Sequence, residues 1–237
     1  MMKKADFEKW NASIRKNVGR EYGFRQSSYI NYIVLSGYFF CLGPTHFNRV
    51  RLEVKPLYVD DLWWQILGIS EVRMTMSLRG TGVLALQAQE LASYEAVTSD
   101  WRCVDEETLK GVWYRVFGDA FQKIQSFLEK NPEAEFFVPD EARIMDRDRL
   151  FYLMTLLYRG RLEEVVTILD EAKRNGHICS NQINSQDSYA YIRQWCEKKT
   201  VECCSVNNKN RKLCFPFDIT HCFLYLCNRK RTVDYGI

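Results

Sequence analysis

The sequence has few of the residues from which metal and catalytic centres are usually built. It contains no H-E-x-x-H and no C-x-x-C, the spacings that zinc sites often use, and its 237 residues include only three histidines, His46, His177 and His221. Cys222 and Cys227 have no matching second pair. Two short groupings, His177 with Cys179 and His221 with Cys222, leave a zinc site open as an alternative. The prediction is that the protein uses no cofactor.

Long apolar runs are also missing. No apolar stretch typical of a signal peptide follows the basic residues Lys3 and Lys4. The longest apolar run, residues 32–43, is interrupted by Ser36 and Gly37, whereas a helix that spans a bilayer needs about 20 apolar residues. We therefore expect no membrane association and a cytoplasmic location, where the nine cysteines would be reduced thiols.

Concentrated positive charge is lacking too. The 33 basic and 30 acidic side chains give a formal net charge of only +3. The arginines at 143, 147 and 149 alternate with acids at 140, 141, 146 and 148, a pattern typical of a solvated helix start. Binding to nucleic acid usually requires a basic face, so we expect no nucleic-acid partner.

The N-terminal part has clear periodic patterns. Apolar residues at helical spacing predict a helix over residues 5–18. Residues 29–35 and 38–42, joined by Ser36-Gly37, predict a β-hairpin with a tight turn. Residues 49–55 alternate between apolar and charged side chains, which predicts an antiparallel strand with one wet face.

After residue 60 the patterns change. Residues 62–69 are ambiguous between strand and helix, and the alternation at 72–79 predicts another strand. The spacing of apolar residues from Leu84 to Ala92 predicts the start of a helix, and a long helix is predicted over 105–130. A last helix is expected over 187–199.

Residues 148–176 predict two amphipathic helices joined at Gly160 and closed by Asn175-Gly176. With Gly160 at the turn and Ala172 at a small-residue position, this stretch resembles a single tetratricopeptide-type unit. No second copy follows at a period of about 34 residues, so a stacked superhelix is not expected. The two alternatives are a hairpin that completes a core and a groove that binds a partner.

Residues 5–70 contain a helix, the Tyr22-Gly23-Phe24 junction, strands, and the segment from Trp63 to Ile69. This arrangement resembles the bacterial proteins grouped as "domain of unknown function 4304". The resemblance implies a small α+β fold and a bacterial origin, and it brings no catalytic residues.

Together these patterns predict an α+β protein in which an N-terminal helix and a mostly antiparallel sheet precede a helical half containing the hairpin. We expect a sheet region at 1–100 and a helical region packed on it at 101–200. Residues 201–237 hold five of the nine cysteines and two basic clusters, and we expect this tail to pack poorly.

The most unusual local grouping follows Pro56, where two carboxylates stand among three large aromatic side chains. Aromatic anchors beside acids are typical of binding hot spots, so we predict a partner-binding site formed by Tyr58, Asp60, Asp61, Trp63 and Trp64. The alternative is that the tryptophans are core and that one of the aspartates caps a helix.

Residues 80–85 match G-x-G-x-x-A, with Asp100 about twenty residues downstream, as in dinucleotide sites. The charged alternation before Gly80 is unlike a buried parallel strand. We therefore interpret the glycines as a strand-to-helix turn.

The sequence thus favours a protein-binding module of adaptor or immunity type, which would use the exposed strand face and the aromatic-acidic segment. The competing hypothesis is a hydrolase-type enzyme with its site between sheet and helices. Its candidate acid and base groups are His46, Glu53, Asp60 and Asp61.

Overall fold

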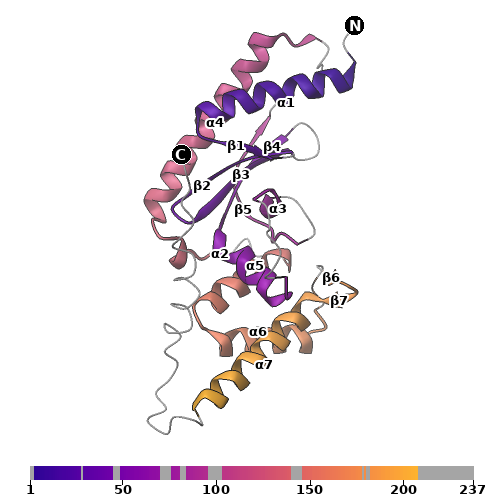
Figure 1. Cartoon of the computed structure of the whole chain (residues 1–237), viewed down its shortest axis with the longest axis vertical. Coiled ribbons are helices and arrows are strands. Elements are labelled where there is room, and N and C mark those ends of the chain that lie inside the picture. Colours follow the sequence, from indigo (N-terminus) through magenta and orange to yellow (C-terminus); the bar gives the residue numbers. More distant parts are fainter. Residues whose placement is uncertain are drawn as a thin grey trace. The chain divides into compact units, whose positions relative to one another are not determined.

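The chain is described from a computed structural model that covers residues 3–27, 29–44, 49–69, 76–80, 84–95, 103–139, 146–177, 179 and 182–207. By compactness the chain divides into two units, Met1–Tyr158 and Arg159–Ile237. An N-terminal helix, a five-stranded antiparallel sheet and further helices confirm the α+β class (Figure 1). The division near residue 100, drawn from the change of period, stays a prediction.

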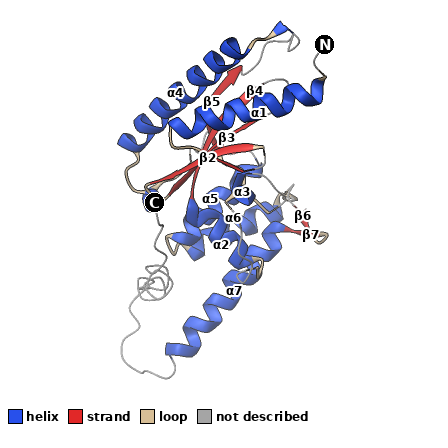
Figure 2. Cartoon of the chain, turned by 45° about the horizontal axis from the view of Figure 1, so that its top comes forward, coloured by secondary structure: helices blue, strands red, loops and turns tan. Residues whose placement is uncertain are grey.

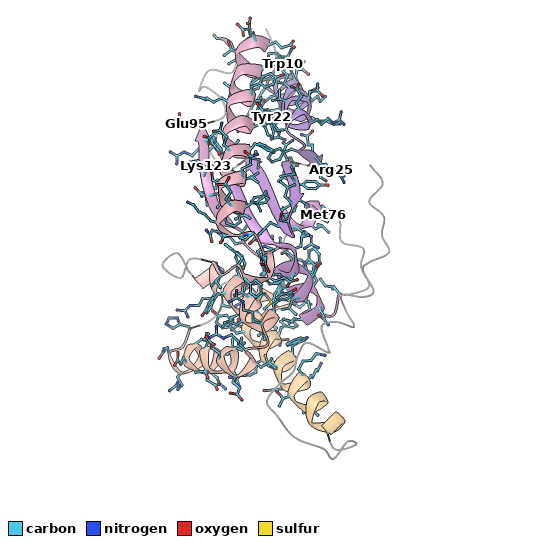
Figure 3. All side chains as sticks on the ribbon, turned by 90° about the vertical axis from the view of Figure 1, so that its left-hand side faces the viewer. Trp10, Tyr22, Arg25, Met76, Glu95 and Lys123 are labelled. Carbon is cyan, nitrogen blue, oxygen red and sulfur yellow. The ribbon has the colours of Figure 1, made fainter. Side chains whose placement is uncertain are left out.

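The sheet of the first unit is formed from strands that follow one another closely in the sequence. After helix α1 (Lys4–Glu21), the strands pair in the order β1-β2-β3-β4-β5, every pair antiparallel. Their bounds are β1 Arg25–Ser27, β2 Ile30–Leu35, β3 Tyr38–Pro44, β4 Arg49–Pro56 and β5 Gln89–Glu95. Figure 3 shows Arg25 and Glu95 towards opposite edges of the sheet, as this order requires.

The expected hairpin turn is confirmed between β2 and β3. Ser36 and Gly37 have φ of 49° and 78°, and positive φ at both central residues defines the turn type that matches the natural twist of a hairpin. The turn sets the register in which Leu35 pairs with Tyr38 and Val34 with Phe39.

Two expectations after residue 70 are wrong. Residues 77–79, assigned to the end of a strand, belong to a short helix, α3 (Ser77–Gly80), while residues 72–75 lie outside the described part of the chain. The helix expected from Leu84 to Ala92 is absent, since β5 begins at Gln89. Leucine and alanine favour helices locally, but pairing with β4 decides the conformation.

The pairing of β5 with β4 contains an irregularity. Leu52 pairs with Ala92 and Glu53 with Glu90, which leaves Leu91 as one extra residue on β5. An extra residue of this kind is a β-bulge, and it shifts the alternation of side chains along the strand.

The remaining helices follow the expected order. Helix α4 (Glu106–Lys130) is capped by Asp105, whose carboxylate accepts a hydrogen bond from the Thr108 N–H at 2.7 Å. A 3-10 turn, η2 (Ala134–Phe136), then precedes α5 (Asp146–Tyr158), α6 (Leu162–Arg174) and α7 (Ser188–Asn207). Both expected helices of the 148–176 segment are therefore present as α5 and α6.

The central strand β3 is apolar throughout, so it has side chains to bury on both faces of the sheet. Both faces are covered at the centre of the sheet. On one face, Phe127 of α4 contacts Tyr38 and Phe40 edge-on at centroid distances of 5.2 and 5.7 Å. Helix α1 packs beside α4 on this side, and Figure 2 shows the strands between this helix pair and helices α2 and α3. On the other face, Ile30, Phe39 and Cys41 form a buried cluster near α3.

The second unit contains α6, α7 and a two-stranded ribbon of β6 (Gln182–Ile183) and β7 (Gln186–Asp187). Helix α6 buries Val165, Leu169 and Ala172 and packs with α7. Helix α7 continues through Asn207, into the region expected to be a poorly packed tail. Residues 208–237 lie outside the described part of the chain.

Two glycines in helix interiors provide a matched test of the packing between α1 and α4. A Cβ added at Gly19 would lie 2.8 Å from Phe117 Cζ and 3.1 Å from Asn31 Nδ2. Both of those side chains are fully buried, and overpacking of this kind costs about 1–3 kcal/mol. Gly111 has nothing within 4 Å. Urea denaturation should show Gly111→Ala stabilised by about 0.5–1 kcal/mol and Gly19→Ala destabilised, whereas equal gains would contradict the close packing.

Candidate functional site

The aromatic-acidic segment lies in helix α2 (Leu57–Ile66), which directly follows β4. The run that was ambiguous between strand and helix is therefore helical up to Ile66. The N-cap position is Pro56, and Asp60 lies within the first turn, where the helix dipole favours a carboxylate. The expectation that Asp60 or Asp61 caps a helix is wrong, because the helix begins earlier than the acids.

A fully buried ion pair joins β4 to α2. Lys55 Nζ donates to Asp60 Oδ1 at 2.9 Å and to the Leu86 carbonyl at 2.6 Å, and the Leu86 N–H donates to Asp60 Oδ1 at 3.1 Å. Both charged side chains are 0% exposed. The pair thus fixes the loop around Leu86 against the strand and the helix with three hydrogen bonds.

Arg79 of α3 extends this network from the side. Its Nη2 donates to Asp61 Oδ1 at 2.6 Å. Its Nη1 donates to the Leu57 carbonyl at 2.7 Å and lies 3.7 Å from Asp60 Oδ2. Its guanidinium also sits 4.8 Å from the centroid of the Trp64 ring, a favourable cation–π geometry. Two cations and two anions therefore form a neutral cluster, which we call the Lys55 clamp: Lys55, Asp60, Asp61 and Arg79.

Burial dominates the electrostatics of the clamp. Desolvation lowers the pKa of Lys55 and raises the pKa of Asp60, while their mutual attraction and hydrogen bond act in the opposite direction. The pair is held by hydrogen bonds on both partners, so its geometry is fixed even though burying the two charges is unfavourable.

The five residues predicted as a partner-binding site come together in α2 and are mostly covered. Trp63 is 0% exposed and Trp64 is buried, with its indole N–H donating to the Leu84 carbonyl at 2.9 Å. Tyr58 stacks on Tyr158 of α5 with centroids 3.7 Å apart. Asp60 and Trp63 are thus part of the interior in this structure, and Asp61 is the most exposed member of the clamp.

The hydrolase hypothesis relied on Glu53 and His46 beside the aspartates. His46 lies outside the described residues. Glu53 pairs across the strands with Cys41 on one side and Glu90 on the other. Desolvation raises the pKa of Glu53, and burial raises the pKa of the Cys41 thiol to about 12. The Cys41 thiol is therefore not ionised as a nucleophile at neutral pH.

The raised pKa of Glu53 predicts a pH-dependent effect of one substitution. The folded protein holds the Glu53 proton more tightly than the unfolded chain does, so the stability due to the protonated form is present at low pH and is lost as the pH rises through the folded pKa. The variant Glu53→Gln has no titrating group at this position, and it removes the like-charge pair with Glu90. We expect the free energy of unfolding to rise by about 0.2–1 kcal/mol.

The gain should be larger at pH 8 than at pH 4, as measured by urea denaturation at both values. Glu107→Gln, an exposed position on α4, is the control and should change stability by less than about 0.5 kcal/mol. An equal gain for Glu53→Gln at both pH values would show that burial does not raise the pKa of Glu53.

The G-x-G-x-x-A segment does not have the surroundings of a dinucleotide site. Gly80 ends α3 rather than a strand, residues 81–83 lie outside the described part of the chain, and a strand, β5, follows instead of a helix. Gly80 has a packing role, since an added Cβ would lie 2.5 Å from Ile30 Cδ1 and 3.0 Å from Cys41 Sγ.

Within the residues that the structure covers, no group of three or more His, Cys, Asp or Glu side chains is arranged to hold a metal ion. Among the same residues, no helix combines the length and apolar character needed to span a membrane.

Lys55 and Arg79 were not recognised from the sequence as members of the site. Lys55 was assigned to the wet face of its strand by alternation, and it does share that face with Arg51 and Glu53. The end of this face is covered by α2 and by the loop around Leu86, which periodicity within one strand cannot indicate. The available signal was an acid, Asp60, five residues after a lysine at a strand end.

Comparison of the chain with protein-family models, with curated proteins and with solved structures found no match in any of the three. The resemblances to domain of unknown function 4304 and to a tetratricopeptide-type unit therefore stay predictions.

Proposed function

We propose that this chain is a protein-binding module of adaptor or immunity type, and that its contact surface is the wet face of strands β4 and β5. This surface, the β4–β5 polar face, consists of the exposed residues Arg49, Arg51, Glu90, Ser93 and Glu95, with the half-buried Glu53 beside them. Register places these residues side by side: Arg51 pairs with Ser93, Glu53 with Glu90, and Arg49 with Glu95.

The observation that carries the proposal is the exposed charge on this surface. Arg51 and Glu90 form an ion pair at 3.2 Å with each side chain 44% exposed. Charges arranged in a fixed pattern on a rigid sheet provide electrostatic complementarity, which sets the choice of partner and the rate of association. Arginine is also enriched in protein interfaces.

The Lys55 clamp supports this role indirectly. Lys55 lies on the same strand and the same sheet face as Arg51 and Glu53, and its hydrogen bonds hold the end of β4. The aromatic-acidic segment would therefore act by positioning the contact surface, since Asp60 and Trp63 are themselves buried.

A charge swap tests the proposal while preserving the local ion pair. The double variant Arg51→Glu with Glu90→Arg exchanges the two charges and so alters the pattern that a partner would meet. The matched control exchanges Glu106 and Lys110 on α4, an exposed ion pair at 2.6 Å. Both double variants should keep wild-type stability to within about 1 kcal/mol.

The wild type and the control should capture the same protein from cells of the source organism, and the β4–β5 variant should capture at least tenfold less. Quantitative mass spectrometry of the captured material gives the ratio. Equal capture by all three chains, or no specific capture by the wild type, would overturn the proposal.

A further inference from the structure

Glu53 of strand β4 is a half-buried carboxylate without a counter-ion. Within the described part of the chain, its side chain makes no hydrogen bond and no ion pair. The neighbouring cations on the same face of β4 are both engaged elsewhere. Arg51 Nε lies 3.2 Å from Glu90 Oε2, and Lys55 Nζ donates to Asp60 Oδ1 at 2.9 Å. A carboxylate withdrawn from water normally has a cation or hydrogen-bond donors beside it.

The residue directly across from Glu53 on β5 is a second glutamate, Glu90. Opposite residues of an antiparallel pair have Cβ atoms about 4.5–5.5 Å apart, and like charges in such a pair are destabilising. On the other side, the partner of Glu53 on β3 is Cys41, whose raised pKa keeps it uncharged at neutral pH. At the far end of the β4–β5 polar face the charges are opposite, since Arg49 pairs with Glu95, which Figure 3 labels.

This arrangement is unfavourable for the folded chain by itself. Burial raises the pKa of Glu53, the attraction of Arg51 and Lys55 acts in the opposite direction, and repulsion from Glu90 adds to the effect of burial. Departures from the local rules of sheet pairing are expected at functional sites. A cation supplied from outside the chain would remove the repulsion between the two glutamates.

We infer, resting on the function proposed above, that Glu53 and Glu90 together receive an arginine side chain of the protein partner. A guanidinium has five N–H donors in a planar fork, so it can donate to two carboxylates at once. It is more weakly hydrated than an ammonium group, which suits a half-buried position. Arg51 contacts only Oε2 of Glu90, so the other oxygen of Glu90 and both oxygens of Glu53 can accept from the incoming arginine.

The test uses nuclear magnetic resonance of the isotope-labelled full chain at pH 7 and low ionic strength, where charge pairs are least screened. The probe is the peptide acetyl-Gly-Arg-Gly-amide. The matched control peptide has citrulline, which has nearly the same shape and no charge, in place of arginine. Backbone amide signals around Glu53 and Glu90 should shift saturably with the arginine peptide, and the citrulline peptide should bind at least tenfold more weakly. A lysine peptide should also bind more weakly than the arginine peptide.

Variants of the chain show which carboxylate matters. Glu53→Gln keeps the shape of the side chain and should weaken binding of the arginine peptide at least tenfold. This variant is expected to be more stable than the wild type, so a loss of binding cannot result from unfolding. Glu90→Gln should also weaken binding, whereas Glu107→Gln, at an exposed position on α4, should bind the peptide as the wild type does.

Equal binding of the arginine and citrulline peptides, equal binding of the arginine and lysine peptides, or unchanged binding in Glu53→Gln would overturn the inference. The peptide measurement needs no cellular partner, so the two proposals can fail separately. Binding of the arginine peptide without capture of any protein from cells would overturn the proposed function alone. Capture that depends on the β4–β5 polar face, without binding of the peptide, would overturn only the assignment of an arginine.

Discussion

Replacing Asp60 by alanine is expected to lower the free energy of unfolding by about 3–5 kcal/mol, because it leaves the ammonium group of Lys55 buried without its counter-charge. Lys55 is 0% exposed, and in the variant its ammonium group keeps the hydrogen bond to the Leu86 carbonyl but loses the one to Asp60. Urea denaturation followed by circular dichroism measures the loss.

The control for this prediction removes both charges. The double variant Lys55→Met with Asp60→Leu keeps similar volumes and should recover most of the stability lost by Asp60→Ala, since an apolar pair avoids the cost of desolvation. Removing the exposed partner Glu90 by Glu90→Ala should cost no more than about 1 kcal/mol. If Asp60→Ala and Glu90→Ala cost the same, Lys55 is not buried as the structure has it.

Trp63→Ala is expected to destabilise the protein by about 3–5 kcal/mol, the range for truncating a large aromatic side chain in a core. Trp63 is fully buried in α2, so the substitution leaves a cavity rather than a smaller surface. The measurement is again the midpoint and slope of the urea transition. A loss of partner binding in this variant would then report unfolding, not a lost contact.

Tyr29→Ala provides the comparison, because Tyr29 is 71% exposed and its truncation should change stability by less than about 0.5 kcal/mol. If Trp63→Ala is as stable as Tyr29→Ala, Trp63 is not part of the core. The direct contact with a partner that the sequence predicts for Trp63 would then be supported again.

Much of the fold could be predicted from periodicity. The helix at Lys4–Glu21, the hairpin around Ser36-Gly37 and the long helix ending at Lys130 all have local signals that agree with their final packing. In each case the apolar face, the turn residues or the cap specify the same structure.

The errors fall where distant parts of the chain decide the outcome. The segment at Leu84–Ala92 has helix-forming residues, but from Gln89 onwards it pairs with β4 as strand β5. By alternation Lys55 belongs to the exposed face of its strand, but in the fold it is covered by α2. Neither the pairing of β5 with β4 nor the covering of Lys55 by α2 produces a periodic pattern in the local sequence. The Lys55 clamp therefore could not be predicted from periodicity.

The unpaired Leu91 in β5 has a consequence for self-association. Side chains before and after it follow opposite alternations, so a second copy of β5 laid antiparallel along this edge could match faces over only a few residues. An edge strand with a uniform alternation of side chains would allow copies of the chain to pair edge to edge and to grow into fibrils. The extra residue Leu91, together with Glu90 and Glu95, instead makes β5 a poor template for pairing with β5 of a second copy.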